Sequence, residues 1–160
     1  MKTTAPLIAI SQPVTIVGYQ VRTDGPGSAD AIPTLWKAVS DGALAAIPDK
    51  LSDDLYAVYA NLENAGISND GYFSFIIGAP VAPGIAVPDG MTLVSIPFSH
   101  RASFPVPGND PSRVIEAWEQ AWAYDDRAKT FVCEYELYPA GGHASVNLGI
   151  RAPRHDDEIE

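Results

Sequence analysis

The chain has 160 residues, 46% of them hydrophobic, and its 20 acidic and 10 basic residues give a net charge of −10. This length suits a single domain with its own core. Nucleic-acid binding needs clustered basic residues, and the sequence has none, so we expect no direct nucleic-acid partner. The sequence also lacks an apolar run of about 18 residues, which argues against a membrane span. A single cysteine, Cys133, allows no intramolecular disulfide and suits a cytoplasmic location.

The hydrophobic pattern predicts one order of elements, strand, helix, strand, strand, in each half of the chain. A Pro/Gly-rich connection separates the halves, which span about 12–80 and 91–152. Because the second half repeats the order of the first, we interpret the chain as a weak internal repeat. The predicted strands are 14–22, 55–60 and 72–78, followed by 92–98 with its continuation 102–106, then 131–138 and 144–150.

Each predicted helix starts at a recognisable cap. In the first half, Ser28 or Asp30 is the expected N-cap, with Pro33 in the first turn of the helix. In the second half, the pair Asp110-Pro111 begins a helix that runs to about residue 123.

Two βαββ halves predict an α+β fold. We expect a tandem βαββ pseudo-repeat whose antiparallel sheet carries both helices on one face and a ligand cleft on the other. This single domain spans residues 1–152, and an acidic tail, 153–160, follows it.

The strand at 131–138 carries two carboxylates and a phenol on one face. Side chains alternate along a strand, so Glu134, Glu136 and Tyr138 point the same way. Either this face lies in water, or it lines the cleft, where a carboxylate beside aromatic rings forms a cation site. The interleaved apolar residues, expected to pack beneath the helices, are Phe131, Cys133, Tyr135 and Leu137.

Aromatic residues on other elements complete the candidate site. Tyr72 is expected to face the cleft from its strand, and Tyr59 ends the neighbouring strand. Trp36, Trp118 and Trp122 have the helical spacing of core residues, and from there one of them can also reach a pocket between the helices and the sheet. The candidate ligand-binding residues are therefore Glu134, Glu136, Tyr138, Tyr59, Tyr72, Trp36 and Trp118.

Motifs for metals, cofactors and catalytic nucleophiles are missing from the sequence. His100, His143 and His155 are scattered and do not approach Cys133 at metal-ligand spacing. A phosphate-binding lysine loop and a Gly-x-Ser-x-Gly motif are both lacking. We therefore expect neither a metal nor a cofactor.

Six short motifs follow one another along the chain: VTIVGYQVR, LWKAV, YFSFIIG, IEAWEQAW, YELY and NLGI. Taken in order, they resemble the GyrI-like effector-binding domains, which are related to the drug-sensing domains of AraC-type and MerR-type regulators. The resemblance covers about residues 12–152. In that family an acidic residue followed two positions later by tyrosine lies in the pocket, and Glu136 and Tyr138 match this pattern.

This resemblance implies a pocket for hydrophobic, often cationic, small molecules. About a dozen residues precede the first matching strand, so the chain resembles the stand-alone members that lack a DNA-binding segment. We favour a binding module with Glu136 as the counter-charge. Two alternatives stay open: a hydrolase of strained electrophilic toxins, with Glu136 as general base and Tyr138 or Tyr72 as proton donor, and an acidic protein-interaction module of gyrase-inhibitor type.

Overall fold

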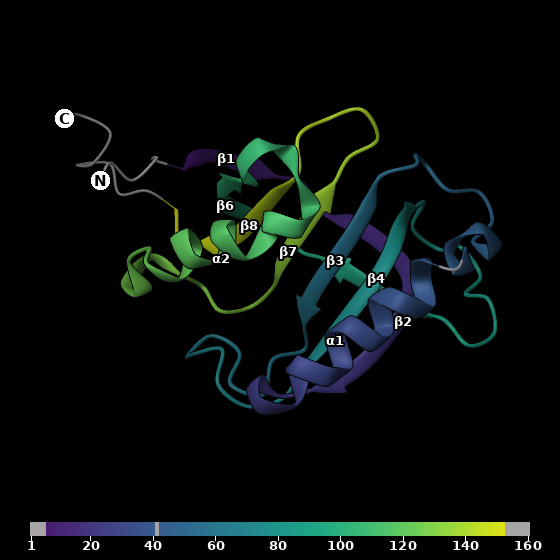
Figure 1. The fold of residues 1–160 in the computed structure, drawn as a ribbon, viewed down its shortest axis with the longest axis horizontal. Coiled ribbons are helices and arrows are strands. Elements are labelled where there is room, and N and C mark those ends of the chain that lie inside the picture. Colours follow the sequence, from purple (N-terminus) through teal and green to yellow (C-terminus); the bar gives the residue numbers. More distant parts are fainter. Residues whose placement is uncertain (1–5, 41, 153–160) are drawn as a thin grey trace.

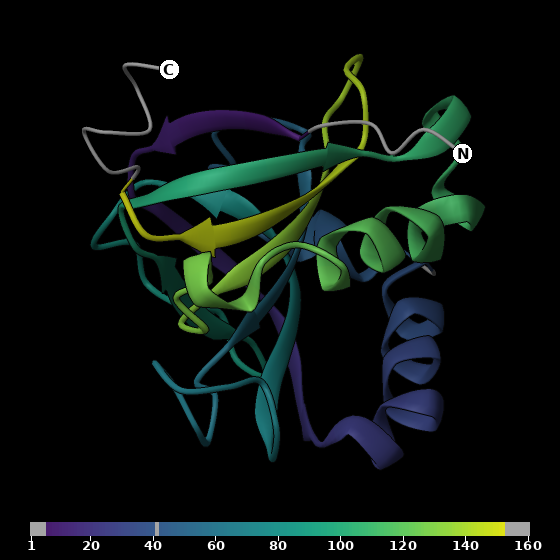
Figure 2. The same ribbon diagram turned by 90° about the vertical axis from the view of Figure 1, so that its left-hand side faces the viewer.

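The computed structural model describes residues 6–40 and 42–152, and within them eight strands form one antiparallel sheet in the order β1-β6-β8-β7-β3-β4-β2-β5. Both α-helices lie on one side of this sheet (Figures 1 and 2), so the predicted α+β class is confirmed. The predicted acidic tail, 153–160, lies outside the described residues. The strands are Leu7–Ser11 (β1), Val14–Thr23 (β2), Leu55–Ala60 (β3), Phe73–Val81 (β4), Thr92–Ile96 (β5), Ser99–Pro105 (β6), Glu134–Tyr138 (β7) and Ser145–Ile150 (β8). The helices are Gly25–Ser40 (α1) and Val114–Trp122 (α2), with short 3-10 turns at Ala43–Ala46, Pro107–Asn109, Pro111–Arg113 and Asp126–Ala128.

The predicted repeat is visible in the connectivity. β2, α1, β3 and β4 form one half, and β6, α2, β7 and β8 form the other. The halves join through antiparallel pairing of β3 with β7, in which Ala57 lies opposite Glu136 and Tyr59 lies opposite Glu134. The junction between the halves therefore carries the residues that the sequence selects as a site.

Each of the two edge strands, β1 and β5, pairs with a strand of the other half of the chain. Only Gln12 and Pro13 separate β1 from β2, yet β1 pairs with β6 of the second half. Similarly, only Pro97 and Phe98 separate β5 from β6, yet β5 pairs with β2 of the first half. Because such short links join strands from opposite ends of the sheet order, the sheet must curl and bring its two edges close together.

This curl closes the face of the sheet that lies away from the helices. Its side chains form a continuous apolar cluster that includes Ile16, Ile76 and Ile96, all with no exposed surface. Cys133 and Tyr135 belong to the same cluster, with Leu137 packed against it. The prediction that these residues pack beneath the helices, and that the opposite face forms a ligand cleft, is therefore wrong, because the curled sheet fills that face with its own side chains.

Each helix covers an apolar cluster on its face of the sheet. α1 packs against β2 and β4, where Phe73, Phe75 and Ile77 are buried. α2 covers β6 and β8, where Phe104 and Leu148 are buried. These separate clusters leave β3 and β7 between the two helices, as Figure 1 shows.

The start of α1 differs from the prediction. Asp24 caps the helix, because its Oδ1 accepts a hydrogen bond from the backbone N–H of Gly27 at 2.7 Å and its carbonyl accepts one from Ser28 at 2.9 Å. Ser28 and Asp30 therefore lie inside the helix, and Pro33 lies in its interior.

The start of the second helical region is confirmed, and the Asp110 side chain accepts from the N–H of Ser112 at 3.0 Å. No helix in the described part of the chain is long and apolar enough to cross a membrane.

Candidate ligand-binding cavity

A cavity of about 1150 Å³ opens between the two helices and the strands β3 and β7. It lies on the helix-bearing side of the sheet. Its volume suits a drug-sized organic molecule. The residues that line it from these four elements include Ile32, Trp36, Leu55, Tyr59, Val114, Ile115, Trp118, Trp122, Glu134, Glu136 and Tyr138.

Glu136 lies at the floor of this cavity and is only 4% exposed. Its Oε2 accepts hydrogen bonds from the Tyr59 hydroxyl and from Trp118 Nε1, both at 2.8 Å. Its Oε1 accepts a hydrogen bond from the Tyr138 hydroxyl. These donors come from β3, α2 and β7, so the carboxylate ties both halves of the chain together.

All three donors to Glu136 are neutral groups. Burial, followed by the negative charge of Glu136, raises the pKa of Tyr59 well above its ordinary value, and the same causes raise the pKa of Tyr138. Both phenols therefore stay protonated at neutral pH and act as donors. Within the described residues no lysine or arginine forms an ion pair with Glu136.

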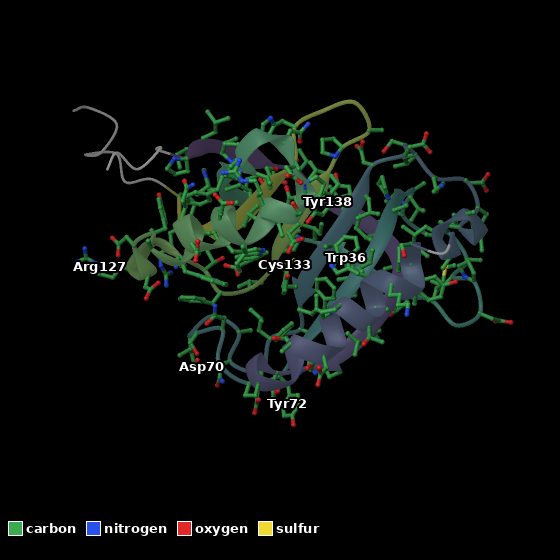
Figure 3. The ribbon with its side chains drawn as sticks, in the orientation of Figure 1. Trp36, Asp70, Tyr72, Arg127, Cys133 and Tyr138 are labelled. Carbon is green, nitrogen blue, oxygen red and sulfur yellow. The ribbon has the colours of Figure 1, made fainter. Side chains whose placement is uncertain are left out.

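Aromatic rings surround this carboxylate. The Tyr59 and Trp118 rings meet edge to face, with centroids 5.1 Å apart. Trp36 of α1 meets Tyr138 edge to face at 5.6 Å, and Figure 3 shows these two residues side by side between the helices. Trp122 stacks on Trp118 at 6.0 Å. Such electron-rich walls beside a carboxylate favour cationic groups.

Glu134, two positions before Glu136 on β7, lines the same cavity and is 6% exposed. Burial raises its pKa to about 7, although the positive charges of Lys129 and Arg101 oppose this shift. Lys129 itself pairs with Asp126 at 2.8 Å.

The structure brings together six of the seven predicted site residues. The exception is Tyr72, which is 51% exposed and does not line the cavity. It precedes β4, and alternation along that strand turns Phe73 toward the cavity instead. In Figure 3, Tyr72 lies away from Trp36 and Tyr138, at the edge of the molecule.

The sequence analysis did not identify the aliphatic walls of the cavity. Of the three tryptophans with the helical spacing of core residues, it expected one to reach a pocket, and all three line the cavity, including Trp122, which follows Trp118 by one helical turn. Cys133 faces away from the cavity, and burial raises the pKa of its thiol to about 11, which keeps it protonated. In the described part of the chain, no group of three His, Cys, Asp or Glu side chains is placed to hold a metal ion.

Comparison with known proteins agrees with this geometry. A family model, "Cass2: Integron-associated effector binding protein", matches residues 8–146. A search of curated protein sequences finds no match.

Three solved structures share the fold. The integron cassette protein VCH_CASS2 from the mobile metagenome of Vibrio cholerae has a TM-score of 0.74 at 19% identity, over 92% of this chain and 96% of that one. A putative transcription regulation protein from Staphylococcus aureus MU50 has a TM-score of 0.72 at 14% identity, over 94% and 100% of the two chains. SAV2435, solved with bound tetraphenylphosphonium, has a TM-score of 0.76 at 15% identity, over 96% and 99%.

The fold and the family model both confirm the resemblance to effector-binding domains. Because the model matches most of its length, this chain belongs to the Cass2 family of integron-associated effector-binding proteins.

Proposed function

We propose that this protein binds a hydrophobic organic cation in the cavity and that Glu136 supplies the counter-charge. The observation that carries this proposal is a carboxylate that is 4% exposed, lies among aromatic rings and accepts hydrogen bonds only from neutral groups.

The energetics of a buried carboxylate support a cationic ligand. Tyr59, Trp118 and Tyr138 donate hydrogen bonds to Glu136 but bring no positive charge to it. A cation with apolar substituents loses little hydration when it enters the cavity, and it offsets the desolvation of the carboxylate. Each aromatic face that meets the cation adds about 0.5–2 kcal/mol.

The comparison with SAV2435 supports the same ligand class. That protein shares the fold and was solved with tetraphenylphosphonium, a bulky cation with four aromatic rings. The cavity of about 1150 Å³ has the size and the aromatic lining that such a molecule requires.

The hydrogen bonds at Glu136 favour binding over hydrolysis. A general base needs a free lone pair directed at the proton it removes. Here Tyr59 and Trp118 both donate to Oε2, and Tyr138 donates to Oε1. This arrangement occupies both oxygens of the carboxylate and leaves little capacity to accept a proton from water.

The test compares tetraphenylphosphonium with tetraphenylborate, an anion of the same shape. All three tryptophans of the chain line the cavity, so their fluorescence reports occupancy directly. We expect the wild-type protein to bind the cation and not the anion. Glu136→Gln should weaken binding of the cation about tenfold or more, since it removes the counter-charge.

The matched control is Glu119→Gln, which removes an exposed charge from α2. It should leave the affinity for tetraphenylphosphonium unchanged. Thermal unfolding of each variant checks that the fold is intact. Equal affinity for the phosphonium and the borate, or equal losses in the two variants, contradicts the proposal.

A further inference from the structure

The cavity contains a second carboxylate that the proposed role of Glu136 leaves unused. Glu134 and Glu136 lie on the same face of β7, two positions apart, which places them roughly 7 Å from each other along the strand. Glu134 is 94% buried, as its 6% exposure shows, and it lines the cavity. Among the described residues no donor forms a hydrogen bond to its carboxylate, whereas Glu136 accepts three.

The positive groups nearest to Glu134 are engaged elsewhere. Lys129 donates to Asp126 Oδ1 at 2.8 Å and to the carbonyl of Trp122 at 3.3 Å. Arg101 of β6 donates to the carbonyls of Cys133 at 2.6 Å and Pro97 at 3.4 Å, and its buried Nε has no partner among the described residues. Both cations therefore influence Glu134 through space without pairing with it.

In the part of the chain that the structure describes, the other elements around Glu134 bring no cation. Tyr59 lies opposite it on β3, but the Tyr59 hydroxyl donates to Glu136. The cavity-lining side chains of α2, among them Trp118, are neutral. Asp70, on the loop before β4, adds another acidic group to the cavity wall. A buried carboxylate without a partner is costly, and a positive group of the ligand removes that cost.

We propose that the cavity takes an aromatic dication whose two positive centres are roughly 7 Å apart, so that Glu136 pairs with one centre and Glu134 with the other. This inference rests on the proposed function, because it assigns the ligand class of the same cavity.

The pairing of Glu134 with the second positive centre of the ligand depends on pH. Burial raises the pKa of Glu134 to about 7. Glu134 is mostly neutral at pH 6, where only Glu136 attracts the ligand. At pH 8 it is mostly ionised, and the second positive centre gains a partner. The preference for a dication over a monocation therefore grows as the pH rises from 6 to 8.

Two biaryl cations of nearly identical shape test the inference. Methyl viologen carries two permanently charged nitrogens roughly as far apart as two same-face positions of a strand, and 1-methyl-4-phenylpyridinium carries one. Calorimetric titration of the wild-type protein at pH 8 should show about tenfold tighter binding of the dication. Glu134→Gln should abolish this difference while it preserves the affinity for the monocation. Glu119→Gln should retain the wild-type preference.

The pH series on the wild-type protein needs no variant and keeps the test valid if Glu134→Gln folds poorly. Equal affinities for the two cations at pH 8, no binding of methyl viologen, or a preference that survives in Glu134→Gln would each overturn the inference. The tetraphenylphosphonium titration separates this result from the proposed function. If that monocation binds through Glu136 and the dication gains nothing, only the second pairing fails.

Discussion

Glu134 and Glu136 share one strand and one cavity, yet their surroundings differ. Three donors hold Glu136 in place, whereas Glu134 is buried against neighbours that donate nothing to it. A buried polar group without a hydrogen-bond partner costs free energy, whereas hydrogen bonds offset the cost of burial. Glu136 is therefore held by its three donors, and Glu134 is a group that the protein buries at a cost.

That cost predicts a pH-dependent effect of Glu134→Gln on stability. The pKa of Glu134 rises from 4.5 to about 7 on folding, so the folded state binds more protons between these values and wild-type stability falls as the pH rises through them. The variant avoids this loss. Relative to wild type, its free energy of unfolding should increase from pH 4.5 to pH 8 by at most about 3 kcal/mol.

Urea unfolding of both proteins at pH 4.5, 6 and 8 measures this difference, and titrations common to both proteins cancel. In the opposite trend, the free energy of unfolding of the wild-type protein would increase relative to that of the variant as the pH rises. That result would mean that Glu134 is paired with a cation in the folded protein.

At this scale, alternation along a strand was sufficient to place Glu134, Glu136 and Tyr138 on one face. It could not predict the hydrogen bonds to Glu136, because Tyr59 is 77 residues away in sequence and Trp118 is 18 residues away on a helix. Those contacts depend on the pairing of β3 with β7 and on the position of α2.

Among the elements, β2 and β4 approach each other unusually closely where Gly18 lies opposite Gly78. A Cβ atom on Gly18 would lie 2.0 Å from the carbonyl oxygen of Ile77, and one on Gly78 would lie 2.3 Å from that of Val17. Neither backbone oxygen can move without breaking the strand pairing. Both positions therefore require glycine.

We expect Gly78→Ala to destabilise the protein by more than about 3 kcal/mol, because the clash involves backbone atoms in the buried centre of the sheet. Gly25→Ala is the matched control, since a Cβ atom there meets no atom within 4 Å. Thermal and urea unfolding compare the two variants. A Gly78→Ala protein as stable as Gly25→Ala would show that β2 and β4 can separate at this point.

Short hydrophobic strands were among the most predictable elements. The hydrophobic segment Leu55–Ala60 is a strand with the predicted bounds. β1 was missed because most of its side chains are exposed. Its five residues, LIAIS, therefore do not alternate between buried and exposed positions. The start of α1 was misplaced because Asp24, Ser28 and Asp30 all have capping side chains, and the sequence does not indicate which of them the chain uses.

For the whole molecule, periodicity identifies the residues that share a face and does not identify the face that the helices cover. The exchange of β1 and β5 between the halves decides this point, because it curls the sheet and fills one face. The remaining face carries α1, α2 and the cavity between them. Such pairing between distant strands leaves no local signal in the sequence.

The net charge of −10 gives the whole surface a weak attraction for cations, so affinity alone does not locate the ligand. The most direct test is a crystal structure of the protein with tetraphenylphosphonium. We expect the cation between α1 and α2, with its phenyl groups against Trp36 and Trp118 and with Glu136 as its nearest carboxylate. A cation bound on the outer surface, with the cavity unfilled, would contradict the proposed function.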